Sequence, residues 1–140
     1  MDDRSYQQVS IDKISKIAQD LAIEKVIPIT IGLVGELGAG KTTFVKCLAE
    51  SLGIGSKEVC SPSYNLLNEY QGAEYLIEHW DLYRLDSLPE ELNFRPEGNI
   101  LRIIEWSNLI DPMDKILDFE LKIKINENDT RDYQFTKLSA

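Results

Sequence analysis

The pattern of hydrophobic and polar positions divides the first part of the chain into a helix, a strand and a second helix. Residues 10–21 carry apolar side chains at helical spacing, which predicts a surface helix with one buried stripe and Ser10 as its N-cap. The stripe consists of Ile11, Ile14, Ile17, Ala18 and Leu21. Residues 27–34 are apolar, rich in β-branched side chains and followed by a glycine, which predicts a central parallel strand. Residues 41–52 predict a second helix that two glycines end. Its inward face and its stop signals are Phe44, Val45, Leu48, Leu52, Gly53 and Gly55.

Three further strands are predicted in the middle of the chain, and two of them end in a carboxylate. Residues 65–70 predict a strand after a proline-containing loop, and the Gln-Gly pair behind it predicts a turn. A second strand covers residues 75–80 with Asp81 near its end. A third covers residues 100–106 with Glu105 near its far end.

The remaining segments predict a short helix and a closing hairpin. An acidic segment predicts a helix that begins at Ser87 or the aspartate before it, with Pro89 in the first turn. Residues 119–125 and 132–138 alternate apolar and polar side chains, which predicts an antiparallel hairpin with one face in water. The fold class expected from all these elements is α/β, a sandwich built on a mixed, mostly parallel sheet flanked by helices, with this C-terminal antiparallel hairpin.

Length and composition limit the classes of protein that fit. With 140 residues, 43% of them hydrophobic, the chain has room for one core, so residues 1–140 predict a single domain. The 24 acidic and 15 basic side chains give a formal charge of −9, so any contact with RNA is expected to be local or delegated to a partner. Cys47 and Cys60 form no metal-binding or disulfide pattern. Because the sequence shows neither a leader nor a membrane-length apolar run, we expect a cytoplasmic protein without membrane contact.

A phosphate-binding pattern lies between the first predicted strand and the second helix. Residues 35–42, GELGAGKT, match GxxxxGK[ST] without a mismatch, in the strand–turn–helix context that the mechanism requires. Backbone N–H groups of such a turn point at the β and γ phosphates, Lys41 adds a full charge, and the Thr42 hydroxyl is placed to ligate Mg²⁺. The nucleotide-binding residues expected here are Gly35, Glu36, Leu37, Gly38, Ala39, Gly40, Lys41, Thr42 and Thr43. This motif predicts a P-loop NTPase-like domain, and the alternative is a glycine-rich turn without chemical meaning.

Two carboxylates at predicted strand ends are candidates for a metal site. Asp81 and Glu105 each follow an apolar run, and the strand ends of a doubly wound sheet are where such a fold presents its ligands. Each is open to a second interpretation as a helix cap, an ion-pair partner or a solvated strand end. His79, the sole histidine, is either a proton carrier or a residue that only shares a strand face with Asp81.

Four segments, in this order and at these separations, resemble the bacterial TsaE (YjeE) family: GELGAGKTTF, SPSYNLLNEY, HWDLYRL and IEWS. This family is the ATPase component of tRNA threonylcarbamoyladenosine synthesis. The resemblance runs from about the first helix to Trp106 and weakens in the terminal hairpin. Many nucleotide hydrolases share the first segment, but its combination with the second and third is specific. Residues 93–102 are shorter than the family's usual connection, which leaves the shape of the surface near Asp81 open.

The resemblance implies a role for each matching residue. Lys41 and Thr42 would bind the phosphates of ATP and Mg²⁺. Glu105 would join Thr42 at the metal, and Asp81 would be the acid needed for hydrolysis, so that Asp81, Glu105 and Lys41 carry catalysis. Arg131 lies near the position where the family has a basic residue beside the nucleotide.

The resemblance also implies partners and a switch. TsaE-like proteins join TsaD and TsaB, and ATP turnover resets that assembly between transfers of threonylcarbamoyl to adenosine 37 of tRNAs that read codons beginning with A. This chain would meet tRNA only indirectly. Residues 61–67 correspond to a loop likened to a GTPase switch, with Ser63 where the family often has threonine. Hydrolysis by the chain alone is expected to be slow, and Arg84 is either an arginine finger or a partner contact.

Two other functions would use the same phosphate-binding turn. A small-molecule kinase would employ Asp81 as its base, although the arginines are scattered rather than gathered in one lid segment. A nucleotide-dependent adaptor or cell-wall regulator would bind ATP without needing to split it. Phosphate acceptors would accelerate a kinase, and an adaptor would keep its biological activity after Asp81→Asn or Glu105→Gln.

Overall fold

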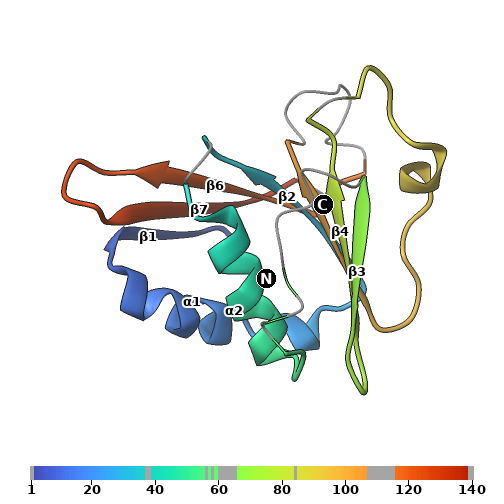
Figure 1. The fold of residues 1–140 in the computed structure, drawn as a ribbon, viewed down its shortest axis with the longest axis horizontal. Helices are drawn as coiled ribbons and strands as arrows, with labels where there is room; N and C mark the ends of the chain where they lie inside the picture. Colours follow the sequence, from blue (N-terminus) through green and yellow to red (C-terminus); the bar gives the residue numbers. More distant parts are fainter. Residues whose placement is uncertain are drawn as a thin grey trace.

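The computed structural model describes residues 2–36, 39–55, 57, 59, 66–83, 85–106 and 116–138. In this part of the chain seven strands form one sheet in the order β1-β7-β6-β2-β5-β4-β3 (Figure 1). The strands are β1 (Arg4–Val9), β2 (Ile29–Val34), β3 (Leu67–Gln71), β4 (Leu76–Asp81), β5 (Ile100–Glu105), β6 (Phe119–Ile125) and β7 (Arg131–Lys137). The α-helices are α1 (Ile14–Leu21) and α2 (Lys41–Ser51), and short 3₁₀ turns are η1 (Ile11–Lys13), η2 (Ile23–Lys25) and η5 (Glu90–Asn93).

The centre of the sheet is parallel. Strand β2 lies between β6 and β5 and is parallel to both, and β4 is parallel to β5. Five of the six residues of β2 are buried, which explains why its sequence is apolar without alternation. The predicted central parallel strand is therefore confirmed. The carboxyl ends of these four strands meet at one edge of the sheet, where the glycine-rich turn after β2 also begins.

Antiparallel strands complete the sheet on both sides. The pairs β1–β7, β7–β6 and β4–β3 are antiparallel, so the described sheet has as many antiparallel pairs as parallel ones. The mixed sheet and the C-terminal hairpin are confirmed, but the sheet is not mostly parallel. One reason is β1, which the sequence did not predict. It is a polar edge strand in which only Val9 is buried, so it carries no hydrophobic pattern.

The two faces of the sheet are covered by different kinds of structure. Helices α1 and α2 lie side by side on one face, and the segment from residue 85 to residue 98, drawn in yellow, lies on the opposite side (Figure 1). Ile77 of β4 and Ile103 of β5 face the helices, whereas Trp80 and Ile104 belong to the second apolar cluster. Among the described residues, both α-helices therefore flank the same face.

Two of the predicted helices differ from expectation in their first turn. Ile11 was expected on the buried stripe, but it is 73% exposed, because a 3₁₀ turn precedes α1 and rotates this side chain outward. Ser10 stands at the cap position, yet its hydroxyl donates to Asp12 Oδ1 at 2.5 Å instead of capping the backbone. The short acidic helix is the 3₁₀ turn η5, with Pro89 before it rather than inside its first turn.

Candidate functional site

The turn between β2 and α2 has a backbone that needs glycine at two described positions. A Cβ on Gly35 would lie 3.0 Å from the Ile123 carbonyl oxygen and 3.1 Å from the Ala39 Cβ, so no larger residue fits without a shift. Gly40 precedes α2 with φ +98, a conformation that side chains rarely adopt. These constraints place the strand, the turn and the helix N-terminus in the order that a phosphate-binding loop requires.

The side chain of Lys41 is buried at this turn and is held from three sides. Its exposed fraction is only 6%. The ammonium Nζ donates to the Gly35 carbonyl at 2.7 Å, lies 4.0 Å from Glu105 Oε1 and sits 3.6 Å from the centroid of the Trp106 ring. Burial lowers the pKa of Lys41, and the carboxylates of Glu105 and Asp81 oppose that effect. The lysine is thus a cation kept close to two acids in a partly dry site.

The two predicted carboxylates lie next to each other. Strands β4 and β5 are parallel and pair Asp81 with Glu105, so both side chains leave the sheet at the same edge and on the face toward α2. Glu105 is 4% exposed, whereas Asp81 is half-buried and its Oδ1 accepts the backbone N–H of Tyr83 at 2.9 Å. One acid is enclosed and the other borders solvent, which suits them to different tasks.

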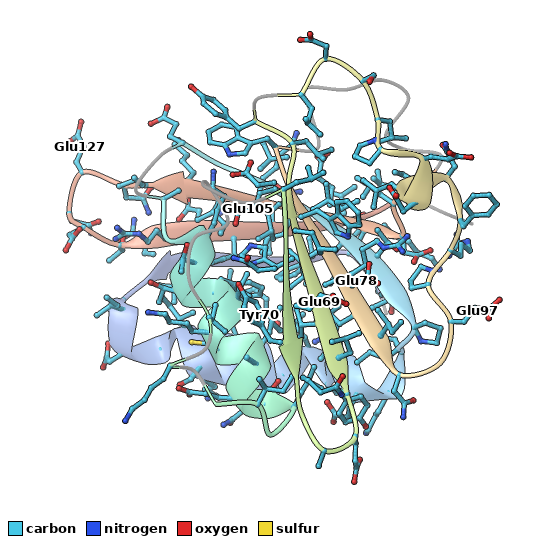
Figure 2. The ribbon with its side chains drawn as sticks, turned by 45° about the vertical axis from the view of Figure 1, so that its right-hand side comes forward. Glu69, Tyr70, Glu78, Glu97, Glu105 and Glu127 are labelled. Atoms are coloured by element: carbon cyan, nitrogen blue, oxygen red, sulfur yellow. The ribbon has the colours of Figure 1, made fainter. Side chains whose placement is uncertain are left out.

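The buried side chain of His79 is hydrogen-bonded to the carboxylate of Glu105. His79 has no exposed surface, and its Nε2 is hydrogen-bonded to Glu105 Oε2. Its Nδ1 is hydrogen-bonded to the Tyr70 hydroxyl at 2.9 Å. Figure 2 shows Glu105 near the upper ends of the strands and Tyr70 lower on β3. The sequence placed His79 and Asp81 on one face, but it contained no signal for the partners of His79, because they come from neighbouring strands.

Trp106 is a site residue that the sequence analysis did not identify. It follows Glu105 directly, adopts a left-handed backbone with φ 64, and turns its ring over the Lys41 ammonium. Its ring also packs against Tyr83, with 4.9 Å between the centroids. The signal available in the sequence was the position of Trp106, directly after the acid at the end of β5.

Arg131 reaches the glycine-rich turn from the other end of the chain. It begins β7, and its Nε donates to the Ala39 carbonyl at 3.2 Å. Its Nη1 donates to the Asp129 carbonyl at 2.9 Å, which fixes the guanidinium beside Gly40. The predicted proximity of this arginine to the glycine-rich turn is therefore seen, although it rests on a contact across 92 residues.

The residues present fit Mg²⁺ bound together with a nucleotide. In the part of the chain that is described, no group of three or more His, Cys, Asp or Glu residues could hold a metal by itself. Mg²⁺ does not need one, because it usually takes one or two carboxylates together with substrate phosphates and water. The Glu105 carboxylate and the Thr42 hydroxyl are hard oxygen donors of this kind, and Thr42 lies in the first turn of α2 with Thr43.

A hollow of about 480 Å³ adjoins the turn. It is lined by Val34, Gly35, Glu36, Ala39, Trp106, Lys122, Ile123, Lys124 and Ile125. The predicted site residues Leu37 and Gly38 lie outside the described residues, as do Ser63, Arg84 and Cys60. The described members of the predicted site converge on one edge of the sheet.

Comparison with known proteins agrees with this arrangement. Residues 8–134 match the family model of TsaE, the threonylcarbamoyl adenosine biosynthesis protein. The chain belongs to the TsaE family. The protein TsaE of Aquifex aeolicus, strain VF5, is 38% identical over 107 residues, which cover 76% of this chain and 78% of that protein. TsaE of Bacillus subtilis, strain 168, is 36% identical over 106 residues, which cover 74% of this chain and 66% of that protein.

A solved structure supports the TsaE assignment at the level of the fold. The crystal structure of YdiB from Bacillus subtilis superimposes with a TM-score of 0.70 at 26% sequence identity and covers 98% of this chain and 86% of the other. The match to the Bacillus subtilis TsaE sequence spans just under two thirds of that protein. The predicted family and its α/β fold are confirmed. No helix among the described residues has the length and apolar character needed to cross a membrane.

Proposed function

We propose that this chain is a Mg²⁺-dependent ATP-binding and ATP-hydrolysing protein. Its proposed role is in the threonylcarbamoylation of adenosine 37 in tRNAs that read codons beginning with A. The observation that carries the proposal is the convergence of Lys41, Glu105 and Asp81 at the turn after β2, in a chain of the TsaE family. ATP and Mg²⁺ are the cofactors, and the ATP-binding residues are those of the turn together with Arg131.

Each site residue has a distinct task in this proposal. Lys41 exchanges its hydrogen bond to the Gly35 carbonyl for one to a phosphate oxygen, because a charged acceptor binds an ammonium more strongly than a neutral carbonyl does. Bound Mg²⁺ supplies charge neutralisation of the phosphates. Thr42 and Glu105 hold the metal. Asp81, at the solvent border, orients a water molecule and accepts its proton.

The output of ATP turnover is proposed to be a change of shape. The element proposed to change is a switch-like segment at residues 61–67, between the turn and Asp81 in the chain. Most of that segment lies outside the described residues. Through it, hydrolysis would reset an assembly with the partners TsaD and TsaB. The net charge of −9 supports a contact with tRNA that is made through these partners.

The proposal is tested by mixing the purified chain with TsaD and TsaB and measuring phosphate release from ATP. We expect slow release by the chain alone and faster release with the partners.

Lys41→Ala should lower nucleotide affinity by ~10- to 100-fold, which is the contribution of a hydrogen bond made by a charged group. Lys46→Ala, an exposed lysine on the same helix, is the matched control and should leave affinity unchanged. Stimulation by a small phosphate acceptor, or equal affinity of both variants and the wild type, would contradict the proposal.

A further inference from the structure

Three polar side chains form a hydrogen-bonded line through the buried side of the sheet. Tyr70 of β3, His79 of β4 and Glu105 of β5 follow one another across three neighbouring strands. Their exposed fractions are 3%, 0% and 4%. The apolar core surrounds the line, because Ile77 and Ile103 flank His79 on its own strand and on the next. Burying polar groups in an apolar core destabilises the fold unless their hydrogen bonds are made, so three buried polar side chains at these positions need a physical explanation.

The bonding pattern fixes which atom donates at each step. A carboxylate only accepts hydrogen bonds, so in the neutral ring that suits this partner Nε2 carries the hydrogen, and the N–H group donates a hydrogen bond to Glu105 Oε2. Nδ1 then accepts a hydrogen bond from the Tyr70 hydroxyl. With both ring nitrogens engaged on opposite sides, a flip of the imidazole would break two buried hydrogen bonds. The orientation of His79 is therefore fixed by residues from the strands on either side of it.

This arrangement determines which way the carboxylate of Glu105 points. Oε2 is occupied by His79, and Oε1 is the oxygen that lies 4.0 Å from Lys41 Nζ, at the glycine-rich turn. A glutamate at a strand end has several rotatable bonds, and an unfixed carboxylate loses side-chain entropy each time it binds a ligand. Anchoring one oxygen leaves the other directed at the turn before any ligand arrives.

We propose that His79 is a positioning residue, which holds Glu105 Oε2 so that Oε1 is presented to Mg²⁺ at the phosphate-binding turn, with Tyr70 fixing the imidazole. The inference rests on the proposed function and adds a residue to it. It also replaces the interpretation of His79 as a proton carrier, because a side chain without exposed surface does not touch the substrate. Partners of this kind behind a metal ligand commonly affect metal affinity by ~10- to 100-fold.

The first test compares two variants that differ only in which ring nitrogen they replace. The amide nitrogen of His79→Gln reaches the place of Nε2 and can donate to Glu105, whereas that of His79→Asn reaches only the place of Nδ1. Titration calorimetry gives the ADP affinity with saturating Mg²⁺ and with EDTA, and the ratio of the two measures the contribution of the metal. We expect this ratio to fall ~10- to 100-fold in His79→Asn and to be largely retained in His79→Gln. ADP affinity in EDTA, unchanged in both, shows that each variant is folded.

A second pair of variants removes one buried phenolic hydroxyl each. Tyr70→Phe deletes the donor to His79 Nδ1 and should lower the Mg²⁺-dependent ratio several-fold without changing affinity in EDTA. Tyr133→Phe is the matched control. Its hydroxyl is also buried and has no hydrogen-bond partner among the described residues, and its ring packs against Phe44 of α2. Its removal should leave the ratio unchanged.

The outcomes separate this inference from the function beneath it. Wild-type protein that binds ADP more tightly with Mg²⁺, together with His79 and Tyr70 variants that show the same ratio, would overturn the positioning role and leave the proposed function intact. Equal loss in His79→Asn and His79→Gln would also overturn it, because the donor at the Nε2 position would not be the cause. Wild-type protein that binds no nucleotide under either condition would remove the proposed function and this inference together.

Discussion

At the scale of single residues, the site is organised by how burial and charge compete. Burial lowers the pKa of Lys41. The carboxylates of Glu105 and Asp81 oppose this effect, and the face of the Trp106 ring also stabilises the ammonium. Glu105 is enclosed and anchored, whereas Asp81 borders solvent and accepts one backbone N–H. The two acids share a strand-end position and differ in surroundings, and those surroundings support their different proposed roles.

The role of Asp81 predicts a loss of turnover without a loss of binding. Asp81→Asn keeps an oxygen that can accept the Tyr83 N–H, so the turn should be preserved, while the amide cannot accept a proton from water. We expect phosphate release with the partners present to fall by ~100-fold or more at unchanged ATP affinity. Asp86→Asn, an exposed aspartate nearby, serves as the control and should behave like the wild type. Intact turnover in Asp81→Asn would show that this acid has no catalytic role.

A second prediction at this scale concerns Tyr133 and alkaline pH. Burial raises the pKa of its phenol from 10.0 to about 12. Between these values the unfolded chain binds fewer protons than the folded one, so the free energy of unfolding falls as pH rises. The loss from pH 9 to pH 11 should be larger in the wild type than in Tyr133→Phe by about 1 kcal/mol, as measured by urea unfolding. Parallel pH profiles of the two proteins would argue against a shifted phenol.

At the scale of elements, the candidate site is built on β2, the glycine-rich turn and α2, and the C-terminal hairpin contacts all three. Gly35 meets the backbone of β6 at close range, and Arg131 at the start of β7 donates to the carbonyl of Ala39. Phe44 of α2 packs against Tyr133 with 5.7 Å between ring centroids. The hairpin therefore supports the turn and α2 through a close backbone approach, a hydrogen bond and a contact between two rings.

The close approach at Gly35 gives a stability prediction. Gly35→Ala would put a methyl group 3.0 Å from the Ile123 carbonyl oxygen, which forces the turn and β6 apart. We expect urea unfolding to show a loss of about 1 to 3 kcal/mol, together with weaker nucleotide binding. Gly55→Ala is the matched control, since among the described residues beyond its chain neighbours no atom lies within 4 Å of the added carbon. Equal stability of the two variants would mean that the approach tolerates a side chain.

At the scale of the whole molecule, a second polar network fastens the layer on the face away from the α-helices. Arg102 of β5, 7% exposed, pairs with Glu78 of β4 at 2.8 Å and donates to the Phe94 carbonyl at 2.6 Å. The same Glu78 carboxylate accepts from the Trp80 indole at 3.0 Å. Through these bonds the segment that covers this face is tied to the two strands whose other face carries Asp81 and Glu105.

Removing one partner of this network should lower the stability of the whole fold. Arg102→Met leaves the Glu78 carboxylate, whose side chain is only 14% exposed, without its cation, and we expect the free energy of unfolding to fall by up to about 3 kcal/mol. Arg102→Met combined with Glu78→Gln should recover part of that loss, because the unpaired charge is gone. Urea unfolding of the single and double variants measures both effects. A double variant less stable than Arg102→Met would show that the charge is not the source of the loss.

The elements that could be predicted are those whose own residues carry the signal. The apolar run of β2, the inward face of α2 and the alternation of β6 and β7 are properties of consecutive side chains. Strand β1 escaped prediction because a polar edge strand has no pattern of its own and gains its place only from pairing with β7. The prediction for Ile11 was wrong because its segment has the residue spacing of an α-helix but forms a 3₁₀ turn. The different number of residues per turn directs the Ile11 side chain to solvent.

The sequence by itself determined the chemical groups of the candidate site, because the glycine-rich turn is a local structure and the two acids mark strand ends. Tertiary structure decided which of them meet. The pairing of β4 with β5 sets Asp81 beside Glu105, and strand register alone gives Glu105 the support of His79. The ring of Trp106 over Lys41 likewise depends on how β5 ends next to α2. Strand register and packing bring together residues that are far apart in the chain, and the pattern of neighbouring residues in the sequence does not predict such contacts.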